Sequence, residues 1–152
     1  MRGSMSKKFD PLALGNQVCF PLYACSKEIV RRYKPFLDPL DLTYTQYIAM
    51  MVMWEEKSIN VKNLGKRLFL DSGTLTPVLK KLESKGYISR KRSKDDERNL
   101  IITITAEGEK LRDKALSVPA SMGDCVKLTK EEAACLYKIL YKVIDGCGTI
   151  EE

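Results

Sequence analysis

The sequence predicts a mainly α-helical domain with a small β-hairpin, arranged as a winged helix-turn-helix. Three observations support this fold class. Apolar residues recur at helical spacing through most of the 152 residues. After Gly86 the period changes from 3.6 to 2, as expected for two short strands. Between Lys57 and Lys94, eleven lysine and arginine residues face only two acidic residues, which favours an anionic partner for this part of the chain.

Composition restricts the classes of protein that this chain can be. With 44% hydrophobic and 30% charged residues, it suits one globular domain. No apolar run has the length of a membrane span and no signal peptide opens the chain, so we expect a cytoplasmic protein without a membrane partner. Met1 to Ser4 resembles an expression scar, which leaves 5–152 as the domain. Five cysteines without a CxxC pair, and no histidine, predict no disulfide framework, metal site, cofactor or enzymatic activity.

The first half of the chain reads as three helices. Residues 12–37 are expected to form a long helix, bent at Pro21 and ended by Pro35 and Pro39. Leu42 and Thr43 open a second helix that continues to Trp54. Ser58 is expected to cap a short third helix, whose inward residues are Val61, Leu64 and Leu68.

A fourth helix, between Asp71 and Gly86, is the expected DNA-reading element. Its apolar residues recur at i, i+3, i+4 and i+7 from Leu75 to Leu82, with Asp71 or Ser72 as a cap. The other face carries small hydroxyl residues first and cations afterwards, which suits base reading and phosphate binding. The predicted DNA-contacting residues of this helix are Ser72, Gly73, Thr74, Thr76, Pro77, Lys80 and Lys81.

The two predicted strands, 87–92 and 100–105, would form the wing that completes the helix-turn-helix segment 42–104. A cation at the hairpin tip can enter the minor groove, and Arg98 is the expected one. Asp96 is expected to hold the wing by pairing with a nearby cation. Arg90 and Lys94 complete the predicted DNA-contacting set.

The remaining residues are expected to form a dimerisation layer. Thr105 caps a helix that runs towards Pro119, residues 119–127 are expected to be a break, and Thr129 caps the last helix. Apolar helices at 12–37 and 106–147 flank the DNA-reading part, an arrangement that suits a two-fold protein reading a two-fold site.

The chain resembles the MarR family of winged-helix repressors, and within it the OhrR, SarZ and MgrA group of organic-hydroperoxide sensors. The resemblance extends to about Leu116 and is poor in the last quarter. It is carried by Asn-Gln-Val-Cys-Phe (16–20), Leu-Thr-Tyr-Thr-Gln-Tyr (42–47), Leu-Asp-Ser-Gly-Thr-Leu-Thr-Pro (70–77), Asp-Asp-Glu-Arg-Asn (95–99) and 100–108. It implies a homodimer that represses from a palindromic double-stranded operator and is released when a peroxide oxidises Cys19.

The resemblance also implies how Cys19 works. Its thiolate would accept hydrogen bonds from Tyr33 and Tyr44, at least partly across the dimer interface, and tyrosine hydroxyls favour the charged sulfur. Oxidation would end in a disulfide with Cys125 of the second subunit, or in a mixed disulfide with a low-molecular-weight thiol. Cys135 and Cys147 are expected to be packed or surface thiols, and Cys25, six residues after Cys19 in the same helix, is not expected to form a disulfide with it.

Two further interpretations stay open on the sequence. In the first, the chain is a MarR-type repressor that is released by a small aromatic ligand without cysteine chemistry. In the second, it is an architectural protein that binds nucleic acid without sequence preference, which the basic stretch between Lys57 and Lys94 permits.

Overall fold

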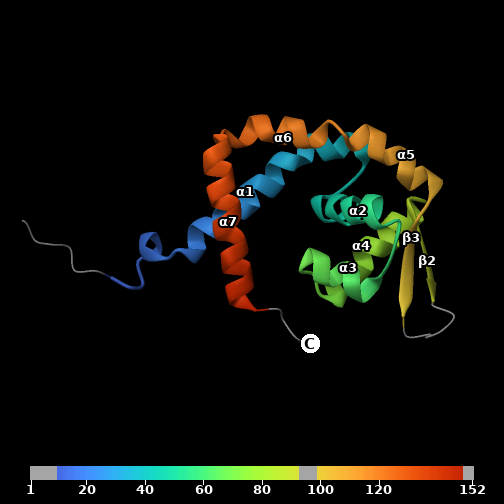
Figure 1. Ribbon diagram of the computed structural model, residues 1–152, viewed down its shortest axis with the longest axis horizontal. Helices are drawn as coiled ribbons and strands as arrows, with labels where there is room; N and C mark the ends of the chain where they lie inside the picture. Colours follow the sequence, from blue (N-terminus) through green and yellow to red (C-terminus); the bar gives the residue numbers. More distant parts are fainter. Residues whose placement is uncertain (1–9, 93–98, 149–152) are drawn as a thin grey trace, which may run out of the picture.

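The computed structural model describes residues 10–92 and 99–148, which form seven α-helices, two short 3₁₀ helices and one small antiparallel sheet in the described part (Figure 1). In Figure 1, α2, α3, α4 and the sheet form one lobe, while α1 and α6 lie side by side along its edge and α7 stands apart from the sheet. The helices are α1 (Cys19–Leu37), α2 (Tyr44–Glu56), α3 (Val61–Leu68), α4 (Ser72–Ser84), α5 (Ala106–Ala115), α6 (Val118–Val126) and α7 (Lys130–Cys147). The 3₁₀ helices are η1 (Leu14–Asn16) and η2 (Asp38–Leu40), and the strands are β1 (Ser58–Asn60), β2 (Ile88–Arg92) and β3 (Leu100–Ile104).

The first long helix starts later than predicted. The expected helix 12–37 was wrong at its beginning, because Leu14–Asn16 is a separate 3₁₀ turn and α1 starts at Cys19. Pro21 is therefore the third residue of α1, where an amide hydrogen has no intrahelical acceptor, so it interrupts no helical bond. Pro35 lies inside α1 rather than at its end.

The segment before α3 also differs from the prediction. Ser58 does not cap α3, because Ser58–Asn60 forms β1 and the side chain of Asn60 accepts the Asn63 amide at 2.7 Å. β1 pairs antiparallel with β3, which places Ser58 opposite Thr103 and produces the strand order β1-β3-β2. The expected hairpin is thus part of a three-stranded sheet. A strand of three residues is too short to show alternation, and its partner lies about 45 residues away in the chain.

The predicted helix-turn-helix and strands are confirmed. α4 starts after Asp71 and buries Leu75, Leu79 and Leu82 against the lobe. Gly86 adopts a left-handed backbone (φ +76°), which lets the chain leave the helix and enter β2. β2 and β3 pair antiparallel.

The expected break at 119–127 was wrong, because Val118–Val126 forms α6. Pro119 is the second residue of that helix, where proline is well tolerated, and the interruption lies instead at 116–117. α7 begins with a capping box in which the Thr129 hydroxyl accepts the Glu132 amide at 3.2 Å and the Glu132 carboxylate accepts the Thr129 amide at 2.8 Å.

The hydrophobic core lies where α2, α3 and α4 meet the sheet. Met50, Met53, Leu64 and Ile102 have essentially no exposed surface there. Leu37 and Leu111 join this core from the flanking helices. In contrast, no residue of α7, all of which the structure describes, is buried. Within 10–92 and 99–148, no helix has the length and apolarity needed to cross a membrane.

Candidate nucleic-acid interface and cysteine site

The exposed face of α4 contains all seven residues predicted to contact DNA from this helix: Ser72, Gly73, Thr74, Thr76, Pro77, Lys80 and Lys81. Asp71 organises the first turn, because its two carboxylate oxygens accept the amide of Thr74 at 2.7 Å and the Thr74 hydroxyl at 2.8 Å. These bonds from Thr74 hold the pKa of Asp71 below its usual value, so the cap stays charged. The Thr76 hydroxyl donates to the Ser72 carbonyl at 2.7 Å, which leaves its oxygen able to accept from a ligand.

The turn between α3 and α4 sets how α4 is presented. A side chain at Gly65 would place its Cβ 2.8 Å from the carbonyl oxygen of Leu70, closer than real Cβ atoms come. The amide of Leu70 donates to the Gly65 carbonyl at 3.0 Å, and Phe69 takes a left-handed backbone (φ +53°). The glycine therefore allows the close approach that this tight turn needs.

Eight of the basic residues between Lys57 and Lys94 fall into two groups, and two more, Lys62 and Lys66 of α3, are exposed without belonging to either. Lys57, Arg67, Lys85 and Arg90 form intramolecular ion pairs with Glu109, with Glu55 and Glu56, with Asp41, and with Glu83, respectively. The second group is exposed next to the recognition face and consists of Lys80, Lys81, Lys91 and Arg92. The second group therefore presents its charge outwards on α4 and on the wing strand.

Arg90 of β2 donates three hydrogen bonds to the carboxylate of Glu83 in α4, and this contact, called the fork below, ties the wing to α4. Its guanidinium donates to one carboxylate oxygen at 2.6 and 2.8 Å, and its amide donates to the other at 3.1 Å. The contact holds the pKa of Glu83 below its usual value. A contact between Arg90 and DNA remains a prediction. The other predicted wing residues, Lys94, Asp96 and Arg98, lie outside the described residues.

Cys19 is the first residue of α1 and is exposed. The segment around it is apolar and uncovered: Val18 is 75% exposed, Phe20 41% and Tyr23 60%. A hollow of about 440 Å³ lies beside it, lined by Leu14, Gly15, Asn16, Gln17, Val18, Phe20 and Pro21. In the single chain the Cys19 side chain is therefore exposed among residues that are more apolar than ordinary surface.

The structure brings the two predicted tyrosines together but keeps Cys19 of the same chain apart from them. The rings of Tyr33 and Tyr44 are 4.8 Å apart, and Tyr47 joins them at 5.9 Å from Tyr33. Burial raises the pKa of all three hydroxyls, so each remains a proton donor at neutral pH. Cys19 and Tyr33 are fourteen residues apart in one helix, which separates them by about 21 Å. Any contact between this sulfur and these hydroxyls therefore requires a second chain.

The remaining cysteines are all thiols without a disulfide partner in the described chain. Cys125 is partly buried near the end of α6, whereas Cys25, Cys135 and Cys147 are exposed. Across residues 10–92 and 99–148, no group of three or more potential ligands is arranged to hold a metal ion.

Sequence reasoning missed several polar and aromatic residues at the α1–α2 junction. Tyr47 was readable from its spacing of three from Tyr44, and the Thr43–Gln46 capping box from its own spacing of three. The contacts of Lys85 with Asp41 and Gln46 span 39 to 44 residues, and no local pattern announces them.

Comparison with known proteins agrees with this architecture. The family model for the transcriptional regulators SarA/Rot matches residues 31–115. The organic hydroperoxide resistance transcriptional regulator of Bacillus subtilis is 45% identical over 141 residues, which cover 93% of this chain and 96% of that protein. The transcriptional regulator SarZ of Staphylococcus haemolyticus is 45% identical over 133 residues, covering 88% and 90%. These relatives are regulators and not enzymes.

Solved structures add the same fold. Reduced AbfR bound to DNA, a protein of Staphylococcus epidermidis, superposes with a TM-score of 0.73 at 33% identity, covering 88% of this chain and 94% of that one. A disulfide-formed AbfR matches with a TM-score of 0.62 at 34% identity, covering 86% and 92%. On the length and identity of these matches, the chain belongs to the SarA/Rot transcriptional regulators, which are winged-helix proteins of the MarR type.

Proposed function

We propose that this protein is a homodimeric repressor that binds a palindromic operator and leaves it when a peroxide oxidises Cys19. The observation that carries the proposal is the position of Cys19, exposed at the start of α1 on an apolar surface. The relative from Bacillus subtilis is named for resistance to organic hydroperoxides, and it covers this segment of the chain within its 93% match.

The exposed face of α4 supports the DNA-binding part of the proposal. Its hydroxyl residues lie in the first turns, where a recognition helix reads base edges, and Lys80 and Lys81 follow where phosphates would lie. The related AbfR is bound to DNA both in a reduced and in an overoxidized structure, so it supports DNA binding rather than release. We propose that Arg98 enters the minor groove, that Lys94 contributes to DNA binding, and that Asp96 holds the wing by pairing with a nearby cation.

The uncovered helices support the homodimer. α7 exposes apolar side chains along its length, namely Leu136, Tyr137, Ile139, Tyr141, Val143 and Ile144. An 18-residue helix that buries nothing in its own chain lacks the tertiary packing from which most helices draw their stability. A second copy covering α7 and the start of α1 supplies that packing, and one copy then faces each half of a two-fold operator.

In such a dimer, the Cys19 thiolate of one subunit accepts hydrogen bonds from Tyr33 and Tyr44 of the other. The thiolate attacks the terminal oxygen of the hydroperoxide, so that an S–O bond forms and the O–O bond breaks. The leaving alkoxide takes a proton from water and departs as an alcohol. The resulting sulfenic acid condenses with a second thiol and releases water. That thiol belongs either to Cys125 of the second subunit or to a low-molecular-weight thiol. The added group overpacks the junction and changes the spacing of the two recognition helices, which tolerates little error.

Operator binding under oxidation tests the proposal. The probe is a DNA duplex selected from a random library by the reduced wild-type protein, and the oxidant is cumene hydroperoxide. We expect the wild type to lose affinity on oxidation and Cys19→Ser to retain it, with the exposed Cys147→Ser as a matched control that behaves as wild type. Release of Cys19→Ser by the peroxide would refute the sensing role. Release of that variant by a small aromatic acid would favour the ligand-regulated alternative.

The final oxidised species is tested separately. After peroxide treatment without added thiol, a disulfide with Cys125 produces a crosslinked dimer on a non-reducing gel, and Cys125→Ser abolishes it. In a second sample, a small thiol is present during peroxide treatment. If the wild type then stays monomeric on the non-reducing gel and its mass increases by that of the small thiol, the mixed disulfide is the product.

A further inference from the structure

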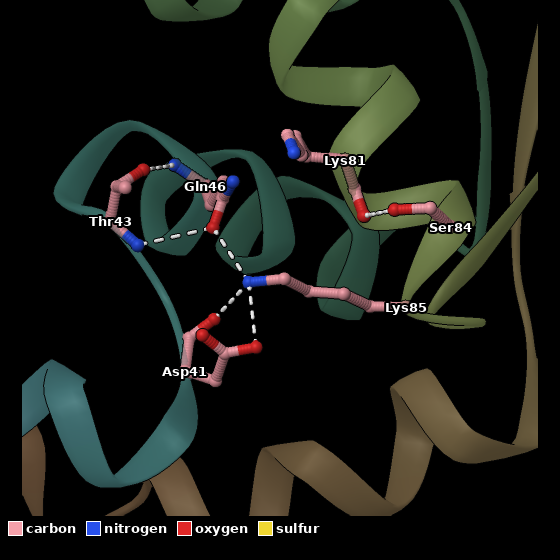
Figure 2. A network of polar contacts seen from close by, with 6 residues as sticks. All are labelled: Asp41, Thr43, Gln46, Lys81, Ser84 and Lys85. Atoms are coloured by element: carbon pink, nitrogen blue, oxygen red, sulfur yellow. Dashed lines mark hydrogen bonds and ion pairs between the residues drawn. The ribbon is translucent and has the colours of Figure 1, made fainter.

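Lys85 lies at the end of α4, and its side chain reaches across the lobe to the loop before α2 (Figure 2). Its ammonium donates to the backbone carbonyl of Asp41, pairs with the Asp41 carboxylate at 3.0 Å and approaches Oε1 of Gln46 at 3.4 Å. The Lys85 side chain is only 22% exposed, unlike the lysines that present their charge to solvent. This ammonium therefore holds together two elements that are distant in sequence.

The acceptors belong to the junction that carries the predicted sensing tyrosines. Oε1 of Gln46 also accepts the Thr43 amide at 3.1 Å, and the Thr43 hydroxyl accepts the Gln46 amide at 3.3 Å. Tyr44 lies between these two residues as the first residue of α2, with its ring against Tyr33 of α1. A displacement of Tyr44 therefore moves the capping box and, with it, an oxygen that Lys85 contacts.

The surroundings leave this network little freedom to adapt. Gln46 is 6% exposed, so water replaces a lost partner of its side chain poorly. Asp41 holds a left-handed backbone (φ +52°), which restricts the conformations open to the loop. At the other end, the Lys85 amide and the Ser84 hydroxyl both donate to the carbonyl of Lys81, at 3.1 and 2.8 Å. Lys81 is a predicted phosphate contact, so the network ends on the DNA-facing helix.

We propose that Lys85 is a positioning residue that couples the α1–α2 junction to the recognition helix, so that a change at Tyr44 alters the placement of α4 on DNA. The proposal rests on the proposed function, because the change at Tyr44 is the one that oxidation of Cys19 causes. The Lys85 ammonium is engaged within the lobe, by Asp41 and Gln46. Its contribution appears in the difference between the reduced and oxidised states.

The experiment measures operator affinity before and after cumene hydroperoxide, using the selected duplex, for wild type and four variants. Lys85→Met keeps the aliphatic length and removes the charge, whereas Lys85→Arg restores a cation. Asp41→Asn removes the carboxylate but retains a residue type that tolerates the left-handed backbone. Lys110→Met is the matched control, because it breaks a lysine–glutamate pair within α5 (2.7 Å to Glu107) that bridges no two elements.

We expect Lys85→Met to reduce the ratio of oxidised to reduced Kd by about threefold or more, within the range seen for residues that carry coupling. Lys85→Arg recovers most of the ratio. Asp41→Asn falls between wild type and Lys85→Met, since the Asp41 carbonyl still accepts from Lys85. Lys110→Met keeps the wild-type ratio. A residue that only stabilised the lobe would lower the melting temperature and leave the ratio unchanged.

A Lys85→Met protein with the wild-type ratio, or with both affinities reduced by the same factor, overturns the coupling role. If Lys85→Met does not fold, Asp41→Asn decides alone, because it leaves Lys85 and the Asp41 backbone in place. Failure of the proposed function gives a different result: the wild-type protein itself then stays bound to its operator after peroxide treatment. The coupling role of Lys85 would be refuted together with it. When peroxide weakens operator binding by the wild type but not by Cys19→Ser, a smaller ratio of oxidised to reduced Kd in Lys85→Met is attributable to Lys85.

Discussion

Replacing Gly108 with alanine should separate α5 from the start of the wing. Gly108 is in the first turn of α5, where its amide donates to the Thr105 hydroxyl at 3.1 Å and its carbonyl accepts the Trp54 indole at 2.8 Å. An added Cβ would lie 2.2 Å from the carbonyl oxygen of Tyr87 and 2.8 Å from Cγ1 of Ile104. The nearer contact involves the backbone, which has no alternative rotamer.

The size of the effect follows from that geometry. An ordinary contact begins near 3.4 Å, so the Cβ and the Tyr87 oxygen must separate by about 1.2 Å. Overpacking of this kind costs about 1–3 kcal/mol, and a backbone clash belongs at the upper end. Alanine recovers up to about 1 kcal/mol of helix propensity. We expect a net loss of about 2 kcal/mol, which in a domain of this size lowers the melting temperature by about 4–8 °C.

Thermal and urea unfolding of the reduced protein measure this loss, at one protein concentration because dimerisation contributes to stability. Gly123→Ala in α6 is the matched control, since nothing lies within 4 Å of its added Cβ and helix propensity favours alanine. Equal stabilities of Gly108→Ala and wild type would refute the packing argument. Because the added Cβ pushes α5 away from the start of the wing, the wing of Gly108→Ala should also tilt. We therefore expect Gly108→Ala to bind the operator more weakly than Gly123→Ala does.

The remaining predictions concern charge. Lys80→Ala and Lys81→Ala should each reduce the slope of log affinity against log salt by about one, without changing sequence preference, and an unchanged slope would remove that lysine from the phosphate contacts. Arg90 lowers the pKa of Glu83 in the folded state below the ordinary value of 4.5. The ionised carboxylate therefore stabilises the folded state at pH values above 4.5, and this stabilisation is lost as the pH falls through the lowered pKa of the folded state. Glu83→Gln should therefore show a smaller loss of unfolding free energy than wild type between about pH 7 and pH 3 in urea titrations. An identical acid profile would show that the fork does not contribute. Because the same fork orients β2 on α4, Glu83→Gln should also weaken operator binding.

Local chemistry explains which elements were predictable. Asp71, Thr105 and Thr129 each accept an amide three residues later, and such capping depends only on adjacent sequence. The apolar stripe of α4 and the change of period after Gly86 depend equally on neighbours. The errors arose where position within an element mattered: Pro21 and Pro119 were read as interruptions, but both lie in first turns that tolerate proline.

The sequence by itself determined the helix-turn-helix, the paired strands of the wing, the exposed hydroxyl and lysine face of α4, and the family resemblance that singles out Cys19. Each of these is encoded over a few residues, by periodicity, by a cap or by a motif. Only the tertiary structure decided that β1 joins the sheet, that Arg90 is held by Glu83, and that Lys85 reaches Asp41 and Gln46. Those contacts depend on where distant segments come to lie, because a side chain takes its partner from whatever the folded backbone brings within hydrogen-bonding distance.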